Sequence, residues 1–442
     1  MLKIISLLFC FVGAATGASD LPVSHFPVSH FPAARFPVVD MAEIRLGRLL
    51  FYDPILSGNK TVACASCHHP RFGTSDGVSL GLGDGGRGLG PDRVAVPDNL
   101  PEQRIGRNSP ALFNLGAAQF SRLFHDGRLE RDPTRPSGIR SPLEDAMTTG
   151  FTSILSAQAM FPVLSPDEMA GHYSENEIST SVRLGMLSLE GGAWEQIANR
   201  VAGIGQYRTA FDALIGPETR IAFTDISNAI ASFIAYEWRA DDAPFDRFLR
   251  HNTPLPAAAM RGLELFYGRA ACASCHSGLF QTDHDFHAIA MPQIGPGKAE
   301  RFESHNRDVG RMRVTGKAAD AYRFRTPSLR NITATAPYGH SGAYANLADV
   351  LRHHLDPVAA LRTYRKTMAV LPHLAGAQDW NVLSDKAEIA AIAAANELAP
   401  MRLSDAEITD LLAFLDSLTD TASLRGRLGI PAQVPSGLAV DR

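Results

Sequence analysis

The sequence CASCH at residues 64–68 occurs a second time, letter for letter, at residues 272–276. The pattern Cys-x-x-Cys-His is typical of c-type haem attachment, in which both thiols bond to the haem and the histidine ligates its iron. A redox disulfide or a four-thiolate zinc site would also use paired cysteines, but neither requires a histidine directly after each pair. We therefore predict redox chemistry and two covalent haem c groups, attached through Cys64, Cys67, Cys272 and Cys275.

The fifth cysteine, Cys10, lies in a segment with the character of a secretory signal. Residues 1–18 contain one basic residue, an apolar run over 4–12 and then small residues up to Ala18. The run is too short to span a bilayer, so we expect a signal peptide over 1–18, cleaved near Ala18, and a mature protein in the periplasm. Every cysteine that remains after cleavage belongs to a haem motif.

Size and composition predict a soluble globular protein with two or three domains. The chain has 442 residues, of which 45% are hydrophobic and 20% charged, and its formal net charge is -4. No basic patch indicates a nucleic-acid partner, and no apolar run after residue 18 is long enough to span a membrane. Both a monomer and a homodimer are compatible with the sequence.

Four sequence blocks occur in the same order in both halves of the chain, which indicates an internal duplication. The first half contains GRLLFY (47–52), CASCH, SPALFN (109–114) and HDG (125–127); the second contains GLELFY (262–267), CASCH, TPSLRN (326–331) and HSG (340–342). Residues 19–38 repeat His/Arg-Phe-Pro steps and predict an extended linker. We therefore expect two tandem haem domains, an N-terminal one over 39–250 and a C-terminal one over 251–430.

The segments around these blocks have helical periodicity. Ser404 and Glu407 form a capping box ahead of apolar residues at helical spacing, and residues 225–238 have a similar pattern. Strand-like alternation is scarce, so we expect a mainly α fold with long loops. The glycine-rich stretch 81–86 matches Gly-x-Gly-x-x-Gly but lacks a strand before it and a helix after it, so it predicts a flexible loop beside the first haem rather than a dinucleotide site.

These blocks resemble those of the dihaem cytochrome c peroxidase/MauG superfamily, from about Val39 to Thr419. The resemblance is carried by LGRLLF (46–51), RNSPAL (107–112), TPSLRN (326–331) and TAPYGHSG (335–342). It implies two cytochrome c-like domains, with a peroxidatic N-terminal haem and a six-coordinate C-terminal haem that transfers electrons. It also implies a calcium ion between the domains, held partly by main-chain oxygens of Thr335 and Pro337.

The motifs make His68 and His276 the proximal iron ligands. In the family, the sixth ligand of the second haem is methionine in bacterial peroxidases and tyrosine in MauG-like enzymes. That position falls here on His354, which continues the apolar stripe of a helix expected to begin near Asn346, whereas His353 is expected to point to its flank. Tyr364 and Met368 are the alternatives.

The surroundings of the first haem differ from the family pattern. Residues 70–100 contain no histidine, and His69 is too close to His68 to reach the opposite face. We therefore expect a five-coordinate or water-bound first haem that reacts with peroxide without prior reduction, which is a MauG-like trait.

Peroxide cleavage needs a distal acid–base group, and the family's glutamate and glutamine are not matched here. The family's Gln-Phe-Trp-Asp-Gly-Arg is LFHDGR over 123–128, and its Glu-Glu-Gln-Ala is SAQA over 156–159. The distal candidates are then His125, Glu144, Asp145, Gln158 and Glu168, although solvated charges are the simpler interpretation of the acidic ones.

The leading hypothesis is a periplasmic peroxidase that reduces hydrogen peroxide to water with electrons from a small cytochrome c or cupredoxin. One alternative is a MauG-like enzyme that uses peroxide to oxidise residues of a partner protein. A second is a non-enzymatic dihaem electron carrier.

Overall fold

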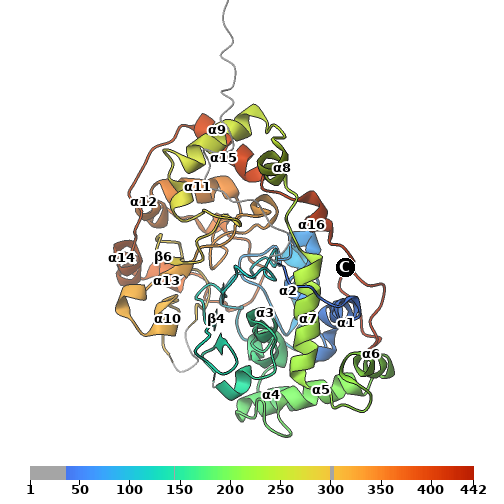
Figure 1. Cartoon of the computed structure of the whole chain (residues 1–442). Helices are drawn as coiled ribbons and strands as arrows, with labels where there is room; N and C mark the ends of the chain where they lie inside the picture. The colour runs from blue at the N-terminus through green and yellow to red at the C-terminus, as the bar shows by residue number, and fades with distance from the viewer. Residues whose placement is uncertain (1–35, 144, 299–302) are drawn as a thin grey trace, which may run out of the picture.

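The computed structural model describes residues 36–143, 145–298 and 303–442, and it is mainly helical, as the sequence predicts. The predicted signal peptide, nearly all of the predicted linker and Glu144 lie outside these residues. In Figure 1 the helices of the second half lie mainly at the top and along the left, and those of the first half at the bottom and right, with the short strands and long loops toward the middle. In the described part of the chain, no helix is both long and apolar enough to cross a membrane.

The first half is organised by helix α1 (Met41–Tyr52), which packs against α7 (Phe223–Glu237). Asp40 caps α1, because its carboxylate accepts a hydrogen bond from the Ala42 N–H at 2.8 Å. Gly47 permits close packing: a Cβ there would lie only 1.8 Å from the carbonyl oxygen of Ala229 on α7. The other helices of this half are α2 (Cys64–Cys67), α3 (Ile154–Gln158), α4 (Glu177–Arg183), α5 (Ala193–Ala202) and α6 (Gly205–Ile215).

The second half repeats this arrangement with α9 (Ala257–Tyr267) and α15 (Asp405–Asp416). Gly262 permits the same close approach, since a Cβ there would lie 1.9 Å from the carbonyl oxygen of Asp410. The two helices lie together at the top of Figure 1. The other helices of this half are α8 (Pro244–His251), α10 (Met312–Thr315), α11 (Leu347–Leu355), α12 (Pro357–Arg362), α13 (Asn381–Ser384), α14 (Lys386–Ala394) and α16 (Thr421–Arg425).

An asparagine fastens the end of the long helix in each half. Asn114 donates through its amide to the Ala240 carbonyl at 3.1 Å and accepts from the Ala240 N–H at 2.8 Å. Asn331 accepts from the Asp420 N–H at 2.8 Å and donates to the Ser423 hydroxyl at 2.8 Å. Both asparagines have a positive φ, which asparagine tolerates better than most residues. The repeated sequence blocks therefore make equivalent contacts.

Among the described residues, the strands are two or three residues long and pair antiparallel in three small sheets. They are β1 (Gly86–Arg87) with β2 (Val94–Ala95); β3 (Arg122–Leu123), β4 (Leu129–Arg131) and β5 (Ile139–Arg140); and β6 (Phe286–His287) with β7 (Phe324–Arg325). In the third sheet, Phe286 pairs with Arg325. Such short strands fix loops rather than form a core.

Two large apolar clusters form the cores, and segments of the second half contribute to the first of them. The first cluster spans α1, α3, α5 and α7 but also contains Leu279, Phe280 and Val434. The segment 427–442 lies along the first half: Gly429 accepts from Arg48 at 2.7 Å, and Asp441 accepts from the Ser66 hydroxyl at 2.7 Å. The second cluster is built from α8, α9 and α15.

Most of the expected local elements are confirmed. The capping box of Ser404 and Glu407 begins α15, the pattern over 225–238 is α7, and the helix expected near Asn346 is α11. The flexible loop expected over 81–86 is wrong, because these residues are buried. The guanidinium of Arg93 donates to the Leu82 carbonyl at 2.5 Å and to the Gly83 carbonyl at 2.8 Å, and these hydrogen bonds hold the loop in place.

Candidate haem sites and the seam between them

The first haem motif forms α2, a single helical turn that places Cys64 and Cys67 one turn apart. His68 follows, and its Nδ1 lies 3.0 Å from the Thr74 carbonyl oxygen. Because a carbonyl only accepts, Nδ1 carries the proton and Nε2 keeps the lone pair that iron needs. Burial lowers the pKa of His68, which keeps the ring neutral. These residues fit a c-type haem.

The second motif forms a 3₁₀ turn, Cys272–Ser274, and makes an equivalent hydrogen bond. His276 Nδ1 lies 3.1 Å from the Gln281 carbonyl oxygen, so here too Nε2 carries the lone pair. Burial lowers the pKa of His276 to about 4, and the next largest cause is the charge of His354. The charge of His354 therefore reaches His276, and this motif also fits a c-type haem.

The candidates for a sixth ligand differ in whether a ligating atom is available. His354 Nδ1 lies 2.8 Å from the Val350 carbonyl oxygen within α11, which leaves Nε2 with a lone pair. Tyr364 donates its hydroxyl to the Ala343 carbonyl at 2.6 Å. Met368 packs in an apolar cluster with Met291 and Ala343. Of the three residues, His354 is the one whose hydrogen bond identifies a ring nitrogen with a free lone pair.

His353 lies beside the apolar stripe of α11, and this flank of the helix is buried. Its side chain is completely buried, with Nε2 2.7 Å from the Ile289 carbonyl oxygen and Nδ1 2.9 Å from the Tyr344 hydroxyl. Both ring nitrogens are therefore engaged. The helix is covered on two faces, so the face beside the apolar stripe is buried as well.

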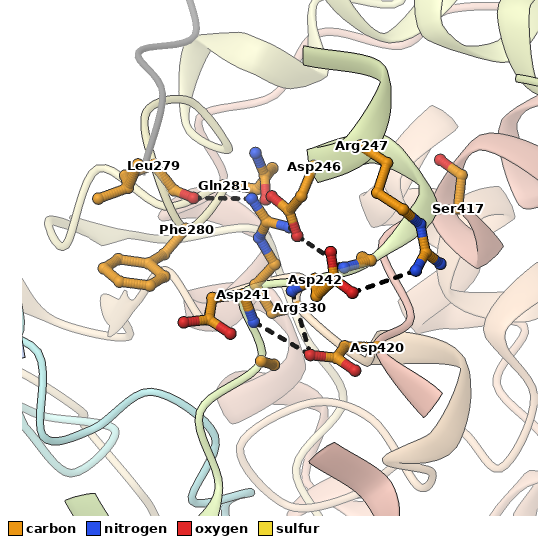
Figure 2. A network of polar contacts seen from close by, with 12 residues as sticks. Asp241, Asp242, Asp246, Arg247, Leu279, Phe280, Gln281, Arg330, Ser417 and Asp420 are labelled. Carbon is orange, nitrogen blue, oxygen red and sulfur yellow. Dashed lines mark hydrogen bonds and ion pairs between the residues drawn. The ribbon is translucent and has the colours of Figure 1, made fainter. Parts of the chain in front are cut away.

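A buried ion pair ties α8, which follows the linker between the halves (residues 238–243), to the loop after His276; Figure 2 shows Arg330 between Asp246 and Leu279. Arg330 lies 2.8 Å from Asp246 on α8, and both side chains have 0% exposure. The same guanidinium donates to the Leu279 carbonyl at 3.0 Å, two residues before Gln281. Phe280, between them, packs on Phe120 of the first half with ring centroids 5.2 Å apart. The support of His276 thus depends on contacts from both halves.

The linker itself is fixed by Asp420. The backbone N–H groups of Asp241 and Asp242 donate to one carboxylate oxygen of Asp420 at 3.1 and 3.2 Å, and Arg247 pairs with Asp242 at 3.1 Å (Figure 2). The linker therefore enters the second half in one fixed direction.

The predicted distal residues do not form one cluster. Ser156 is buried and bonds within the cap of α3, so it offers no acid. Gln158 has a buried Oε1 that lacks a hydrogen-bond partner among the described residues. Glu168 lies in a short π-helix, Pro166–Ala170, near enough to Cys67 for its charge to raise the pKa of that thiol, after the larger effect of burial. Asp145 pairs with Arg135 at the surface.

His125 lies at the seam between the halves. Its Nε2 is 3.1 Å from the Asn108 carbonyl oxygen, its own carbonyl accepts from the Arg325 N–H at 2.7 Å, and burial lowers its pKa to about 4. Its repeat counterpart, His340, is buried and stacks on Phe324 with ring centroids 3.7 Å apart. This environment opposes protonation of His125, so it is poorly suited to donate a proton.

Ion pairs that sequence reasoning missed join the halves at this seam. Arg107 contacts Asp308 through two nitrogens, at 2.7 and 2.8 Å, and lies 2.7 Å from Asp126. Arg104 pairs with Asp379 at 2.8 Å. The local sequence gives no sign of these partners, because each second-half carboxylate is about two hundred residues or more away along the chain.

Two further titratable groups near the first motif were also missed. Asp76 is buried, and burial raises its pKa to about 7. Burial lowers the pKa of Lys298, and the charges of Arg128 and Glu168 act on it in opposite directions. A polar stretch of sequence such as 74–76 gives no signal that its carboxylate is buried.

The two residues expected to bind calcium lie against the loop that follows the first motif. Thr335 follows Ala334, whose carbonyl oxygen would lie 2.3 Å from a Cβ at Gly73, and the Ala336–Pro337 peptide is cis. The expected segment therefore does reach the junction of the two halves.

A His–carboxylate group lies beside the second motif. His287 is 2.9 Å from Asp283 and 3.2 Å from Glu397, and with Cys275 and Asp283 it could in principle surround a metal ion. The sulfur of Cys275 is needed for haem attachment, so we interpret this group as part of the edge of the second haem site.

Comparisons with known proteins agree with this geometry. The sequence profile of the family described as di-haem cytochrome c peroxidase matches residues 41–254. The chain is 29% identical to the methylamine utilization protein MauG of Methylorubrum extorquens, over 85% of this chain and 78% of that protein. It is 28% identical to cytochrome c551 peroxidase of Nitrosomonas europaea, over 78% and 81% of the two chains.

Solved structures are similar over nearly the whole chain. A MauG-like protein associated with microbial copper homeostasis is 25% identical with a TM-score of 0.57, covering 92% of this chain and 96% of that one. The diheme peroxidase BthA of Burkholderia thailandensis is 21% identical with a TM-score of 0.60, covering 94% of each chain, and it supports the fold alone.

Proposed function

We propose, from the premise that the chain belongs to the dihaem cytochrome c peroxidase/MauG superfamily, that it reduces hydrogen peroxide to water in the periplasm. Electrons would come from a small cytochrome c or cupredoxin, pass through the second haem and reach peroxide at the first. The haems supply the redox chemistry, and the chain binds them, fixes their ligands and handles protons.

The observation that carries this proposal is that the second haem motif has a second histidine available as an iron ligand, whereas the first motif does not. At the second motif, the charge of His354 reaches His276 and each of the two rings has a free Nε2, which suits a six-coordinate electron-transfer haem with His276 and His354 as ligands. At the first motif, His68 has no such partner in residues 70–100. We infer that peroxide reaches the first haem on the side opposite His68.

Exposure supports the direction of electron flow. The cysteines of both motifs are partly exposed, but Ser274 of the second motif is exposed, whereas its counterpart Ser66 in the first motif is buried. Electron transfer is favoured where a haem edge is near the surface, so the donor would dock beside the second motif.

For proton transfer we propose Glu168, with Gln158 assisting. Glu168 lies near Cys67 of the first motif, and Gln158 has a buried oxygen that a water or substrate hydroxyl could satisfy. Glu168→Gln keeps the shape but removes the acid, so kcat/KM for peroxide should fall about 10²–10⁴-fold. A fall of less than threefold would remove Glu168 from the mechanism.

The repeated contacts lead us to infer two duplicated cytochrome c-like domains, over 39–250 and 251–430, with a calcium ion at their junction beside Thr335 and Pro337. The equivalent bonds of Asn114 and Asn331 support the duplication. Calcium removal by a chelator should lower peroxidase activity, and added calcium should restore it.

The decisive experiment combines turnover with spectroscopy. The purified dihaem protein should consume peroxide with reduced cytochrome c as the donor, and its ferric spectrum should contain one high-spin and one low-spin haem. His354→Ala should convert the low-spin signal to high-spin while the haem content stays unchanged. His353→Gln is the matched neighbour and should keep the low-spin signal.

A MauG-like oxidation of a partner protein is the second candidate. It is favoured by the lack of a histidine in residues 70–100, because such a first haem needs no reductive activation. Slow turnover with cytochrome c, together with a long-lived oxidised spectrum, would select it. If the protein does not react with peroxide at all, the remaining function is that of a non-enzymatic dihaem electron carrier.

A further inference from the structure

A basic surface lies over α12, α13 and α14, the helices on the left of Figure 1. Four cations make up this surface, and all are exposed: Arg362, Arg365, Lys366 and Lys386. Among the described residues, none of the four forms an ion pair with a carboxylate, and Lys366 lies over the ring of Trp380 at 5.1 Å. The whole chain has a formal net charge of -4, so the sign of this surface is opposite to that of the protein.

The carboxylates nearest to this basic surface in the sequence are engaged elsewhere. Asp385 caps α14, because its Oδ1 accepts from the N–H groups of Ala387 and Glu388 at 2.9 and 3.2 Å. Glu388 is buried and accepts from the Tyr322 hydroxyl at 2.8 Å. Even with Asp385 counted, the basic surface presents a net positive charge to the solvent.

A pocket of about 250 Å³ opens within the basic surface, between the three helices. Leu361, Leu383 and Ile389 give it an apolar lining, and Arg362 and Lys386 lie at the same pocket. Protein–protein interfaces commonly have an apolar centre and a polar rim. The pocket therefore suits an apolar side chain of a partner protein whose surrounding surface is acidic.

Tyr364 also lines this pocket and connects it with the second haem site. Its ring centroid is 5.5 Å from that of Tyr344, the rings of Tyr344 and His353 are 5.4 Å apart, and those of His353 and His354 are 6.1 Å apart. Three ring contacts thus separate the pocket from His354, the residue proposed to ligate the second haem. A protein bound at the pocket would lie close to that haem.

The far end of α14 lies beside the second haem motif. Glu397, three residues after α14, is 3.2 Å from His287, and ligating atoms of His287, Asp283 and Cys275 lie within 4.8 Å of one another. Glu397 also pairs with Arg323 at 2.8 Å, so its charge is balanced within the protein. Helix α14 therefore joins the basic surface to the partly exposed edge of the second motif.

We propose that this basic surface is the docking site of the electron donor, and that the donor is a small redox protein with an acidic surface. The inference rests on the proposed function, because it gives a place and a charge to the donor of that reaction. Each encounter delivers one electron to the second haem, and two electrons with two protons from the solvent reduce one hydrogen peroxide to two waters. Opposite charges raise the rate of encounter by about 10–10³-fold, and salt screens this attraction.

The test compares two reduced donors in steady-state peroxide turnover by the dihaem protein, at low and at high ionic strength. The donors are plastocyanin, an acidic cupredoxin, and mitochondrial cytochrome c, which is basic. We expect a higher kcat/KM for plastocyanin at low ionic strength, and a fall of about tenfold or more at high ionic strength.

Arg362→Glu/Arg365→Glu should lower the kcat/KM for plastocyanin by about tenfold or more, and only at low ionic strength. The matched control is Arg131→Glu/Arg183→Glu, which changes the net charge equally at exposed positions of the first half and should leave kcat/KM nearly unchanged. Lys386→Glu, on a different helix, should lower kcat/KM in the same way, and haem content and circular dichroism verify that each variant folds. Binding of oxidised plastocyanin to the ferric protein gives a Kd that does not depend on turnover.

A higher kcat/KM for the basic donor, or equal losses in Arg362→Glu/Arg365→Glu and in the control, would overturn the inference and leave the proposed function intact. If the wild-type protein does not react with peroxide, the proposed function fails and the Kd decides the inference. Salt-sensitive binding of plastocyanin that Arg362→Glu/Arg365→Glu abolishes would then support the docking surface, and lack of binding would overturn both.

Discussion

Replacing Arg330 by methionine should destabilise the protein strongly, because its partner would remain buried and charged. The Asp246 carboxylate is 2.8 Å from the guanidinium and neither side chain is exposed, so water cannot take the place of the lost cation. Breaking such a buried pair from one side costs about 3–5 kcal/mol. The loss of the hydrogen bond to the Leu279 carbonyl adds to this cost.

Denaturant unfolding of the dihaem protein, followed by far-ultraviolet circular dichroism and haem absorbance, measures the change as a lower midpoint at unchanged slope. Arg261→Met is the comparison, since Arg261 pairs with Asp410 at 2.6 Å in the same half but its side chain is 59% exposed, so water can take the place of the lost cation and the midpoint should fall far less. The double variant Arg330→Met/Asp246→Leu should recover most of the stability, because it leaves no buried charge.

Equal midpoints for Arg330→Met and Arg261→Met would refute the reasoning, since burial is the difference between the two pairs. A double variant no more stable than Arg330→Met would also contradict it, because the cost is assigned to the orphaned carboxylate. The haem-two low-spin spectrum should change in Arg330→Met and stay unchanged in Arg261→Met, since only Arg330 supports the loop that holds the proximal imidazole.

Two further predictions concern other positions. Burial alone would lower the pKa of His287, but its hydrogen bonds to Asp283 and Glu397 outweigh burial and raise the pKa above its usual value. The charged His287 therefore stabilises the fold fully below the pKa of about 6.5 that a histidine has in the unfolded chain, and this stabilisation is lost as the pH rises through the pKa in the folded protein. The denaturant midpoints of the wild type and of His287→Gln should differ at acidic pH and converge at alkaline pH. Gly262→Ala would place a methyl group 1.9 Å from the Asp410 carbonyl oxygen, so α9 and α15 must separate. We expect the free energy of unfolding, measured with denaturant, to fall by about 1–3 kcal/mol. A midpoint equal to that of the wild type would contradict this packing.

The features that the sequence predicts best are those that depend on residues close together along the chain. The haem motifs, the capping box of Ser404 and the start of α11 near Asn346 are local patterns, and the structure has each of them. The helical periodicity also places His353 beside the apolar stripe, but it gives no sign that Tyr344 and Ile289, from other segments, cover that flank.

The remaining errors come from long-range partners. The block TPSLRN (326–331) indicates a sequence repeat that includes Arg330. Nothing near Arg330 in the sequence indicates that its charge is neutralised by Asp246, 84 residues earlier. The glycine-rich loop over 81–86 has a composition typical of a mobile segment, and the side chain of Arg93 fixes it by binding its carbonyls. The distal acid that we propose, Glu168, is hard to single out for the same reason, because about a hundred residues separate it from Cys67 in the sequence.

The segment 427–442 and the loop around Phe280 make the first half depend on the second for its folding. Asp441, from the second half, closes over the turn that carries Cys64 and Cys67, and Phe280, from the second half, completes the core of the first. A chain divided after residue 250 would leave the first haem-binding turn without its outer wall and expose an aromatic ring on the other fragment. Segments of the second half therefore complete the core of the first half and cover its haem-binding turn.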